Sequence, residues 1–373
     1  MKHRQWFLFV VAVICSAGLA VARFAAGAIP AQAAPAATKV TLQLKWVTQA
    51  QFAGYYCAQA KGYYRDAGLE VTIKPGGPGI TPAQEVASGK AEFGVSWMSS
   101  LLAMRGQGID LVNIAQVTRR SGMTEITWKD SGIRSIAQLR GKRVAVWLAG
   151  NEDELFAALI KNGINPRDPR EVTIVPQGLD MEPFLQRKVD AAAAMTYNEL
   201  AQVLETTNPT TGRLYQPSDL NVITMESAGT AMLQGGIVVR GDWIRSKKNQ
   251  ETARRFLEAS FKGWIYCRDH PQEAVEIVLQ NDPALGRGHQ TWQMNEINAL
   301  IWPAPQGLGI IDPAAFQRTA GIAREFGVIK KVAPGAYRTD LATAAVRALQ
   351  REGLDVYGRG WRKAAVEVTP GAK

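Results

Sequence analysis

Residues 38–65, TKVTLQLKWVTQAQFAGYYCAQAKGYYR, contain a strand, a turn and a helix in direct succession. In residues 40–44 apolar and polar side chains alternate, which is the period of a half-buried strand. From Phe52 to Arg65 the apolar residues recur at helical spacing, and Gly68 then ends the helix. Leu69–Ile73 follows as a second strand-like run. This order is typical of a βαβ unit.

The same unit recurs along the chain. Short apolar runs predict further strands at Phe93–Val95, Arg143–Trp147, Val172–Val175, Ala191–Met195 and Gly236–Val239. Polar residues that favour helix starts precede or follow these runs, at Thr81, Ser99, Ser135 and Asn151. Strands separated by helices of this length predict an α/β fold with mainly parallel sheets.

The chain has 373 residues, more than one ordinary domain, so we expect two lobes. Two polar segments that contain glycine, residues 122–130 and 227–236, are the expected crossings between them. The first lobe would then comprise residues 38–125 and 228–350, and the second residues 126–227. Residues 351–373 would form a C-terminal tail, and its basic end is expected to be solvated.

Residues 1–33 are interpreted as a secretory signal peptide. A basic start, Met1–Arg4, precedes an apolar run from Trp6 to Ala22, and Ala31-Gln32-Ala33 has the A-x-A form of a cleavage site. A retained membrane anchor is the alternative, since the apolar run approaches the ~17–20 residues that a span needs. We expect the mature protein to be soluble and exported.

The small numbers of cysteine and histidine residues and the distribution of charge argue against several classes of function. Three cysteines and three histidines argue against a Cys-rich or His-based metal site, and no metal is predicted. In an oxidising compartment Cys57 and Cys267 could form a disulfide, although two buried thiols are the favoured interpretation. His270 and His289 are expected at the surface. The net charge is +10, but the basic residues are scattered, so no nucleic-acid partner is predicted.

Several catalytic and nucleotide-binding motifs are missing from the sequence. It contains no G-x-x-x-x-G-K-[ST], no G-x-G-x-x-G after a strand, no G-x-S-x-G and no H-E-x-x-H. This inventory favours a binding protein over an enzyme, without a cofactor.

Candidate ligand-binding residues gather in the turns that follow strands. In an open α/β sheet, ligands bind at the carboxyl ends of the strands, where those turns lie. Each turn combines an aromatic ring with polar groups, which suits a flat ligand held by stacking and by hydrogen bonds at its edges. The candidates are Trp46, Gln49, Gln51, Phe52 and Tyr55, then Trp97 and Ser99, and in the second lobe Trp147, Asn151, Glu152, Tyr197, Asn198 and Glu199.

Packing is the competing explanation for several of these candidates. The three tryptophans could equally be core residues, and only one of the adjacent Tyr55 and Tyr56 can face a cleft. Asn151 is also explained as a helix cap.

The charge pattern of the turns bears on the ligand. Helix N-termini favour anions, but the helix after Asn151 already carries Glu152, Asp153 and Glu154 in its first turn. The turns hold no cluster of Arg or Lys, although Arg119 and Arg120 near the first crossing could supply one. We therefore expect a neutral or weakly cationic heteroaromatic ligand rather than nitrate, sulfonate or phosphate.

Taken together, these segments resemble the NMT1/THI5-like family. The resemblance rests on Leu44-Lys45-Trp46, Gly54-Tyr55-Tyr56-Cys57-Ala58, Lys61-Gly62-Tyr63-Tyr64, Ala91–Ser96, Gly141–Val144, Gly150-Asn151-Glu152, Asp190 and Asn198-Glu199. It extends well over residues 38–240 and more loosely to about residue 349.

The resemblance implies a type II-like periplasmic-binding-protein fold, with two lobes, a hinge and a ligand cleft. It also implies a monomeric periplasmic receptor that docks transiently on the membrane permease of an ABC transporter. Its ligand would be a pyrimidine precursor of thiamine or a related heteroaromatic compound. By position, the residues of the cleft would be Trp46, Gln49–Phe52, Trp97, Asn151 and Tyr197–Glu199.

Two alternatives stay open. One is a pyrimidine synthase, because some eukaryotic relatives build the thiamine pyrimidine with a histidine in the turn after the first strand. That position is Phe52 here, and residues 191–196 lack the cysteine-rich run of those enzymes. The other alternative is a sulfonate- or nitrate-type receptor. An exported sensor without a transporter would share the same sequence features.

Overall fold

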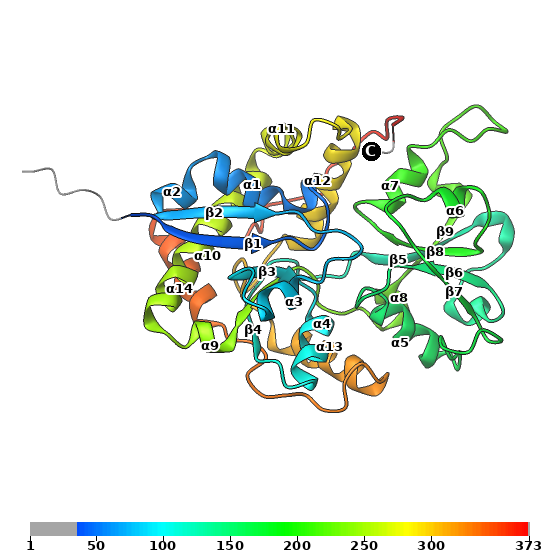
Figure 1. Cartoon of the computed structure of the whole chain (residues 1–373). Helices are drawn as coiled ribbons and strands as arrows, with labels where there is room; N and C mark the ends of the chain where they lie inside the picture. Colours follow the sequence, from blue (N-terminus) through cyan, green and yellow to red (C-terminus); the bar gives the residue numbers. More distant parts are fainter. Residues whose placement is uncertain (1–35, 372–373) are drawn as a thin grey trace, which may run out of the picture. The chain divides into compact units, whose positions relative to one another are not determined.

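The structure, a computed structural model, describes residues 36–371, so the predicted signal peptide lies outside the described residues. The described strands form two five-stranded sheets, each surrounded by helices (Figure 1). We call the part around the first sheet the first lobe and the part around the second sheet the second lobe. The predicted α/β fold is confirmed.

The first sheet has the strand order β2-β1-β3-β10-β4. Its strands are β1 (Thr38–Gln43), β2 (Leu69–Lys74), β3 (Phe93–Ser96), β4 (Leu111–Gln116) and β10 (Gly236–Arg240). β1 pairs in parallel with β2 and β3, whereas β10 runs antiparallel between β3 and β4. The strand that returns from the second lobe is thus inserted into the middle of the first sheet.

The second sheet repeats this plan with the order β7-β6-β8-β5-β9. It consists of β5 (Met123–Trp128), β6 (Arg143–Val146), β7 (Thr173–Pro176), β8 (Ala191–Met195) and β9 (Leu220–Thr224). The parallel strands β6, β7 and β8 are joined by an antiparallel β5, which also pairs with β9.

Helices cover both sheets. The first lobe has η1 (Ala50–Phe52), α1 (Ala53–Ala60), α2 (Tyr63–Asp66), α3 (Pro82–Ala87), α4 (Met98–Gly106), α9 (Gly241–Ile244), α10 (Lys247–Asp269), α11 (Pro271–Asn281), α12 (Arg287–Ile301), α13 (Pro313–Glu325) and α14 (Asp340–Arg351). The second has η2 (Lys129–Ser131), η3 (Ile136–Leu139), α5 (Asp153–Lys161), α6 (Glu182–Leu185), α7 (Glu199–Leu204), η4 (Pro217–Asp219) and α8 (Met225–Ala228). The helix predicted from Phe52 to Arg65 is divided into η1, α1 and α2, with Gly62 in the left-handed region at φ 77°.

Helices α1 and α10 of the first lobe pack closely against each other where they cross. A Cβ atom on Gly54 would lie 2.2 Å from the Trp264 ring, and one on Gly263 would collide with the Gly54 carbonyl oxygen, so the two helices need glycine where they cross. The same contact brings the buried thiols of Cys57 and Cys267 to an Sγ–Sγ distance of 3.4 Å, without a disulfide.

The first crossing differs from its prediction. Residues 122–130 are not a polar connection, because Met123–Trp128 form β5, a fully buried strand inside the second sheet. The chain crosses between the sheets in residues 117–122, the first crossing segment, and returns in residues 229–235, the second crossing segment. The second sheet thus begins three residues before the predicted boundary. The polar Thr124, Glu125 and Thr127, together with Gly122, made this buried strand look like a loop.

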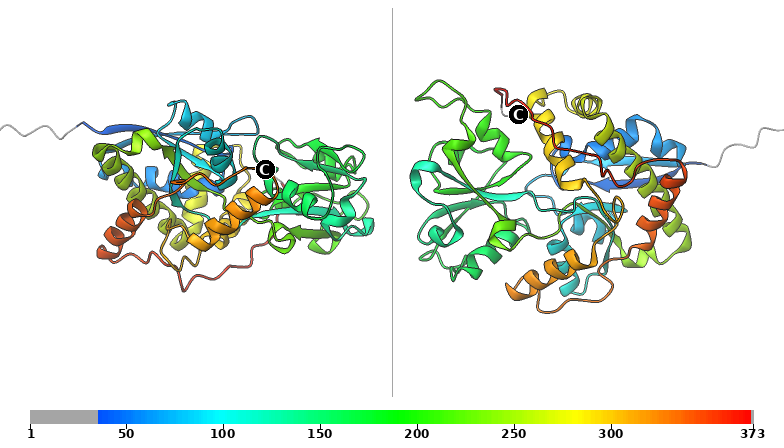
Figure 2. Two further views of the ribbon diagram at one scale, coloured as in Figure 1. Left: turned by 90° about the horizontal axis from the view of Figure 1, so that it is seen from below. Right: turned by 180° about the vertical axis from the view of Figure 1, so that it is seen from behind.

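The C-terminal tail is not a solvated end along its whole length. Residues 359–371, which we call the strap, run along α12 (Figure 2). The Asn295 side chain bonds both backbone groups of Ala364, at 2.9 and 3.1 Å, and Lys363 pairs with Glu296. Further on, Val368 packs against the apolar core of the second lobe. The strap therefore contacts both lobes, although its Arg359, Arg362 and Lys363 are exposed as expected.

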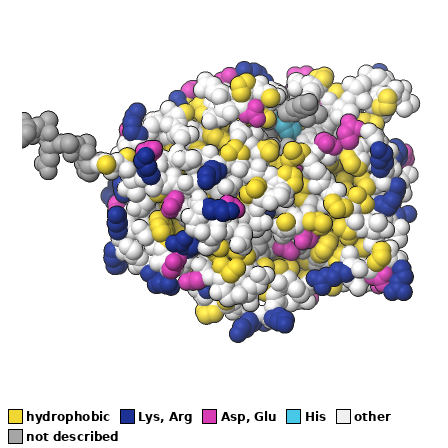
Figure 3. All heavy atoms as spheres, viewed as in Figure 1, with side chains coloured by type: hydrophobic (Ala, Val, Ile, Leu, Met, Phe, Trp, Pro, Cys, Tyr) yellow, Lys and Arg dark blue, Asp and Glu magenta, His cyan; other side chains and the backbone are white. Residues whose placement is uncertain are grey.

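Charged side chains are dispersed over the surface. On the face that Figure 3 shows, Lys and Arg side chains form separate groups with Asp and Glu between them. Across residues 36–371, no helix has the length and apolar character that a membrane span requires.

Candidate functional site

Four turns from the two lobes meet at one cleft. Trp46 follows β1, Trp97 follows β3, Trp147 follows β6 and Tyr197 follows β8, so each ring lies at the carboxyl end of a parallel strand. This is where ligands bind in open α/β sheets. The walls are formed by Lys45, Trp46, Gln51, Trp97, Trp147, Asn151, Met195, Tyr197, Asn198 and Glu199.

The cleft is closed in this structure. The Trp46 ring of the first lobe contacts the Trp147 ring of the second edge to face, with centroids 6.0 Å apart and an interplanar angle of 75°. The space left between the walls is about 30 Å³, the share of one water molecule in the liquid. A flat ligand can enter only if the lobes move apart and the two rings separate.

Eight of the thirteen predicted site residues line this cleft: Trp46, Gln51, Trp97, Trp147, Asn151, Tyr197, Asn198 and Glu199. Phe52 and Tyr55 line an adjoining cavity, also of about 30 Å³, that lies deeper in the first lobe. Tyr55 packs edge to face on Trp264, with ring centroids 5.5 Å apart, and its hydroxyl has no hydrogen-bond partner among residues 36–371. Tyr56 instead bonds Thr48, so only one of the two tyrosines faces the cleft region.

Gln49, Ser99 and Glu152 line neither cavity, and each has a supporting contact instead. The Gln49 amide donates to the Gln51 side chain at 2.5 Å. Ser99 is buried at the start of α4, where it helps to lower the pKa of the Asp153 carboxyl group of the second lobe against the larger effect of burial. Glu152 accepts from the Gly150 backbone N–H at 2.8 Å and so shapes the turn before α5.

Lys45 is the site residue that sequence reasoning missed. We expected no cluster of Arg or Lys in the turns and did not predict Lys45 as a site residue. This side chain lines both cavities, is buried, and has its Nζ 5.1 Å from the Trp97 ring centroid. Burial lowers the pKa of Lys45 to about 8, against the attraction of Asp153 and Glu152. It is charged at neutral pH. Its position directly before Trp46, at the end of β1, was the available signal.

Two carboxyl groups of the second lobe, at or near the cleft, have raised pKa values. Burial raises the pKa of Glu199 to about 7, although the Met195 N–H donates to it at 3.0 Å and the Asn198 amide at 2.5 Å. Burial likewise raises the pKa of Asp153 to about 6. The first lobe therefore offers the Lys45 ammonium group as a hydrogen-bond donor. The second lobe offers the Glu199 carboxyl group, which can be protonated or ionised near neutral pH.

The turn between β6 and α5 is shaped for close approach of the lobes. Ala149 has φ 67°, a left-handed conformation that is costly for a residue other than glycine. A Cβ on the next residue, Gly150, would lie 2.7 Å from the Ser100 hydroxyl oxygen of the first lobe. Asn151 is not the helix cap that we considered, because its amide donates to the Leu148 carbonyl and α5 begins after Glu152.

Helix α12 holds both sides of the cleft. Its Gln290 and Gln293 side chains accept from the backbone N–H groups of Ala50 and Gln51, at 2.7 and 2.8 Å, and so fix the first-lobe turn. Trp292 donates from its indole N–H to the Thr196 carbonyl of the second lobe at 3.0 Å. One helix therefore positions residues on either side of the site.

The expectation that His289 lies at the surface is wrong. This residue is only 4% exposed, and its ring nitrogens lie 2.9 Å from Glu205 Oε2 and 2.9 Å from Asn198 Oδ1, both in the second lobe. Asn198 in turn bonds Glu199, so a buried polar chain leads from α12 to the cleft. His270 is half exposed.

The described residues, 36–371, contain no group of three His, Cys, Asp or Glu side chains that could hold a metal ion. The cleft itself offers aromatic faces, one ammonium group, amides and carboxyl groups. This chemistry suits binding of a flat polar molecule.

The class of fold follows from solved structures. The chain is similar to the alkanesulfonate-binding protein SsuA from Xanthomonas axonopodis pv. citri bound to MOPS, with a TM-score of 0.60, 16% identity, and coverage of 82% of this chain and all of that one. It is also similar to the periplasmic nitrate-binding protein NrtA from Synechocystis PCC 6803, with a TM-score of 0.55 and 14% identity over 87% and 93% of the two chains. The fold is that of the periplasmic solute-binding proteins, as predicted.

The chain belongs to the NMT1/THI5-like family, whose model matches residues 49–274. The resemblance inferred from the sequence is thereby confirmed.

Among relatives, the "Riboflavin-binding protein RibY" of Chloroflexus aurantiacus is 26% identical over 80% of this chain and 83% of its own. The "Putative thiamine biosynthesis protein" of Haemophilus influenzae is 26% identical over 66% and 74%. A yeast enzyme, the "4-amino-5-hydroxymethyl-2-methylpyrimidine phosphate synthase THI11" of Saccharomyces cerevisiae, is 24% identical over 66% and 72%. The family thus includes proteins named for binding and proteins named for synthesis.

Proposed function

We propose that this protein is a receptor that captures a small heteroaromatic solute between its two lobes. The observation that carries the proposal is the meeting of Trp46 and Trp97 from the first lobe with Trp147 and Tyr197 from the second. Rings on both sides of a cleft can enclose a planar ligand, and such enclosure stabilises the closed arrangement of the lobes.

The polar groups of the cleft favour a ligand ring whose edge carries both hydrogen-bond donors and acceptors. The Lys45 ammonium group can donate to a carbonyl or ring nitrogen, and the Glu199 carboxyl group, whose pKa burial raises to about 7, can accept from an amino or ring N–H. An aminopyrimidine or the polar ring of a flavin presents both kinds of edge. The names of the bacterial relatives, which refer to riboflavin and to thiamine biosynthesis, support this class of ligand.

A receptor is favoured over a pyrimidine synthase. The yeast relatives are named as synthases, but the resemblance places a catalytic histidine of those enzymes at the position of Phe52. Here Phe52 is 1% exposed and forms part of an apolar wall. A phenyl ring can neither transfer a proton nor ligate a metal, so this wall supports binding rather than catalysis.

Export and delivery complete the proposal. The sequence pattern of residues 1–33 supports secretion into the periplasm through a cleaved signal peptide. The solute-binding fold supports a monomer that docks on the permease of an ABC importer after closing on its ligand. The lobe boundaries also belong to this proposal, with the crossing segments acting as the hinge.

Titration calorimetry against a matched panel tests the function. The panel comprises an aminopyrimidine, riboflavin, an alkanesulfonate and nitrate, each titrated into the mature protein. We expect saturable binding of at least one heteroaromatic compound and none of nitrate. Binding of the sulfonate alone would assign Lys45 to an anion site and overturn the heteroaromatic proposal. Formation of a pyrimidine from supplied precursors and iron would instead support the synthase.

A further inference from the structure

Three arginines gather at a second cavity, beside the crossing segments. Arg119 and Arg120 lie in the first crossing segment, and Arg318 lies on α13. They line a cavity of about 510 Å³ and an adjoining one of about 180 Å³. The possibility that Arg119 and Arg120 supply a cation to the ligand cleft is not realised, because neither lines the cleft.

These guanidinium groups lack carboxylate partners. Within residues 36–371, none of the three forms an ion pair within 4.0 Å. Arg119 donates to the Gln306 side chain at 2.5 Å and to the Ile310 carbonyl at 3.3 Å, and Arg120 donates to the Ala299 and Trp302 carbonyls at 3.1 and 3.3 Å. No hydrogen bond from Arg318 to any described residue is formed. A guanidinium has five N–H donors, so much of their donor capacity stays unused.

Two carboxylates also line these cavities, but both are kept apart from the arginines. Asp312 caps α13 by accepting from the Ala314 N–H at 2.9 Å, and Glu226 is exposed on α8. Burial lowers the pKa of Arg119, and the nearby Arg120 adds to this effect against the attraction of Asp312. Asp312 thus offsets part of the repulsion between Arg119 and Arg120, but it forms no ion pair with either of them.

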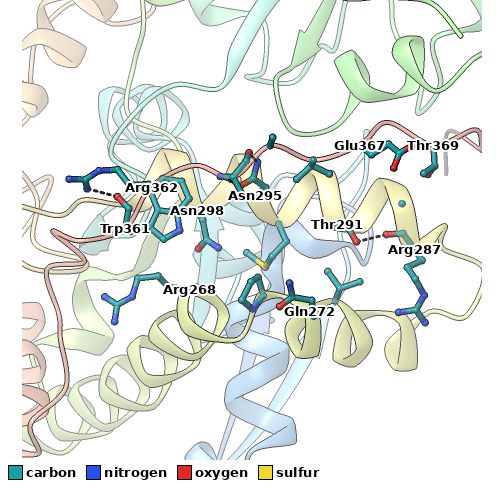
Figure 4. A pocket seen from close by; sticks show the side chains of 17 residues that line it. Arg268, Gln272, Arg287, Thr291, Asn295, Asn298, Trp361, Arg362, Glu367 and Thr369 are labelled. Carbon is teal, nitrogen blue, oxygen red and sulfur yellow. Dashed lines mark hydrogen bonds between the residues drawn. The ribbon is translucent and has the colours of Figure 1, made fainter.

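The cavity under the strap differs in how its arginines are paired. It is larger, about 820 Å³, and Arg268, Arg287 and Arg362 are among its lining residues (Figure 4). However, Arg268 pairs with Asp269 at 2.7 Å, and Arg287 pairs with Glu276. Only Arg362 there lacks a carboxylate. The strap cavity is thus the larger of the two, but fewer of its arginines lack a carboxylate partner. Guanidinium groups without such a partner are the ones available to bind an anion.

We propose that the cavity beside the crossing segments binds a small free oxyanion, of the phosphate or polycarboxylate class. Arg318 would supply its unused guanidinium donors and Arg119 and Arg120 their remaining ones. Thr224 lies in the same wall, whereas the hydroxyl of the neighbouring Ser121 already donates to Glu154 at 2.7 Å. Because the walls include both crossing segments, α13 and the second-lobe residues Thr224 and Glu226, the anion would join parts of both lobes at the hinge. This inference goes beyond the proposed function and does not depend on the identity of the cleft ligand.

Titration of inorganic phosphate into the full-length mature protein, at constant ionic strength set with sodium chloride, tests the proposal. We expect saturable binding that Arg318→Gln weakens by roughly 10-fold or more, the effect of losing charge-assisted hydrogen bonds. Arg324→Gln, a change on the same helix outside the cavity, is the matched control and should leave phosphate binding unchanged. Arg318 is the residue of choice because it is exposed and its removal breaks no hydrogen bond or ion pair with the described residues.

Each other result overturns the inference. Equal weakening by Arg318→Gln and Arg324→Gln would mean general charge screening, and absence of saturable phosphate binding would mean no anion site. Loss of phosphate binding in Trp46→Ala would place the anion in the cleft instead. Sedimentation with phosphatidylglycerol vesicles that requires Arg318, without any binding of free phosphate, would assign the arginines to a membrane surface.

Discussion

At the scale of single residues, Trp46 is the first-lobe ring that contacts its second-lobe counterpart Trp147 across the cleft. In Trp46→Ala, a flat ligand would lose one stacking face, so we expect its binding to weaken by roughly 1–3 kcal/mol, by analogy with bases stacked on aromatic side chains. Calorimetry with whichever panel compound binds the unmodified protein measures this change.

The matched control for that measurement is Trp361→Ala, which removes an indole from the strap cavity, far along the chain from the cleft walls. Its affinity for the ligand should equal that of the unmodified protein. If both variants bind equally well, Trp46 has no part in the site.

Glu125 illustrates how one buried group affects stability. It lies in the interior strand β5 with no solvent exposure, and neither carboxyl oxygen has a hydrogen-bond partner among residues 36–371. Burial raises its pKa well above the usual range. An unsatisfied buried polar group costs about 1–3 kcal/mol. We therefore expect Glu125→Met, which has a similar volume, to raise the free energy of unfolding by up to that amount in urea titrations. Glu125→Gln retains a polar group and should gain little; an equal gain in both variants would contradict this explanation.

At the scale of elements, α12 and the strap work as a unit. Gln290, Gln293 and His289 of α12 contact both walls of the cleft, and Asn295 and Glu296 of the same helix hold the strap. A helix held by contacts to both lobes and to the strap has less freedom to move than one held by a single neighbour. The strap thus stabilises the helix that supports the site.

Asn295→Ala removes the paired hydrogen bonds to Ala364, so we expect the strap to detach more often and expose Arg359, Arg362 and Lys363 to cleavage. Limited digestion with trypsin, followed by mass spectrometry of the C-terminal fragments, should show faster cleavage at these sites. Asn281→Ala, at the end of α11, removes a bond to the Ile277 carbonyl and leaves the strap untouched. Equal cleavage rates for the two variants would show that Asn295 does not retain the strap.

At the scale of the whole molecule, Glu154 connects the two crossing segments. Its carboxyl group accepts from Ser121 of the first crossing segment at 2.7 Å and from Gln234 of the second at 2.8 Å, while Glu154 itself belongs to α5 of the second lobe. Burial raises its pKa to about 8, despite these donors. At neutral pH the folded protein therefore keeps a proton on this group that the unfolded chain releases.

This difference predicts a pH dependence with a definite sign. Between the ordinary pKa of 4.5 and about 8, the unfolded chain is ionised and the folded protein is not, so stability falls as pH rises, by up to about 1.4 kcal/mol per pH unit. We expect Glu154→Gln to have a flatter profile over pH 5–8 in urea titrations, even if its stability is lower throughout. Glu226→Gln, an exposed change near the hinge, is the control and should retain the steep profile. Parallel profiles for Glu154→Gln and the unmodified protein would exclude Glu154 as the source.

The sequence by itself determined the α/β alternation, the family and most of the cleft aromatics, because hydrophobic period and position after a strand are local properties. Ala191–Met195, for example, is a strand in both the prediction and the structure. Buried polar groups escaped this reasoning: β5 with Glu125 resembled a loop, His289 resembled a surface residue, and Lys45 was not among the predicted site residues. Only the tertiary structure decided these positions, because whether a buried polar side chain finds a partner depends on segments that are distant in the sequence.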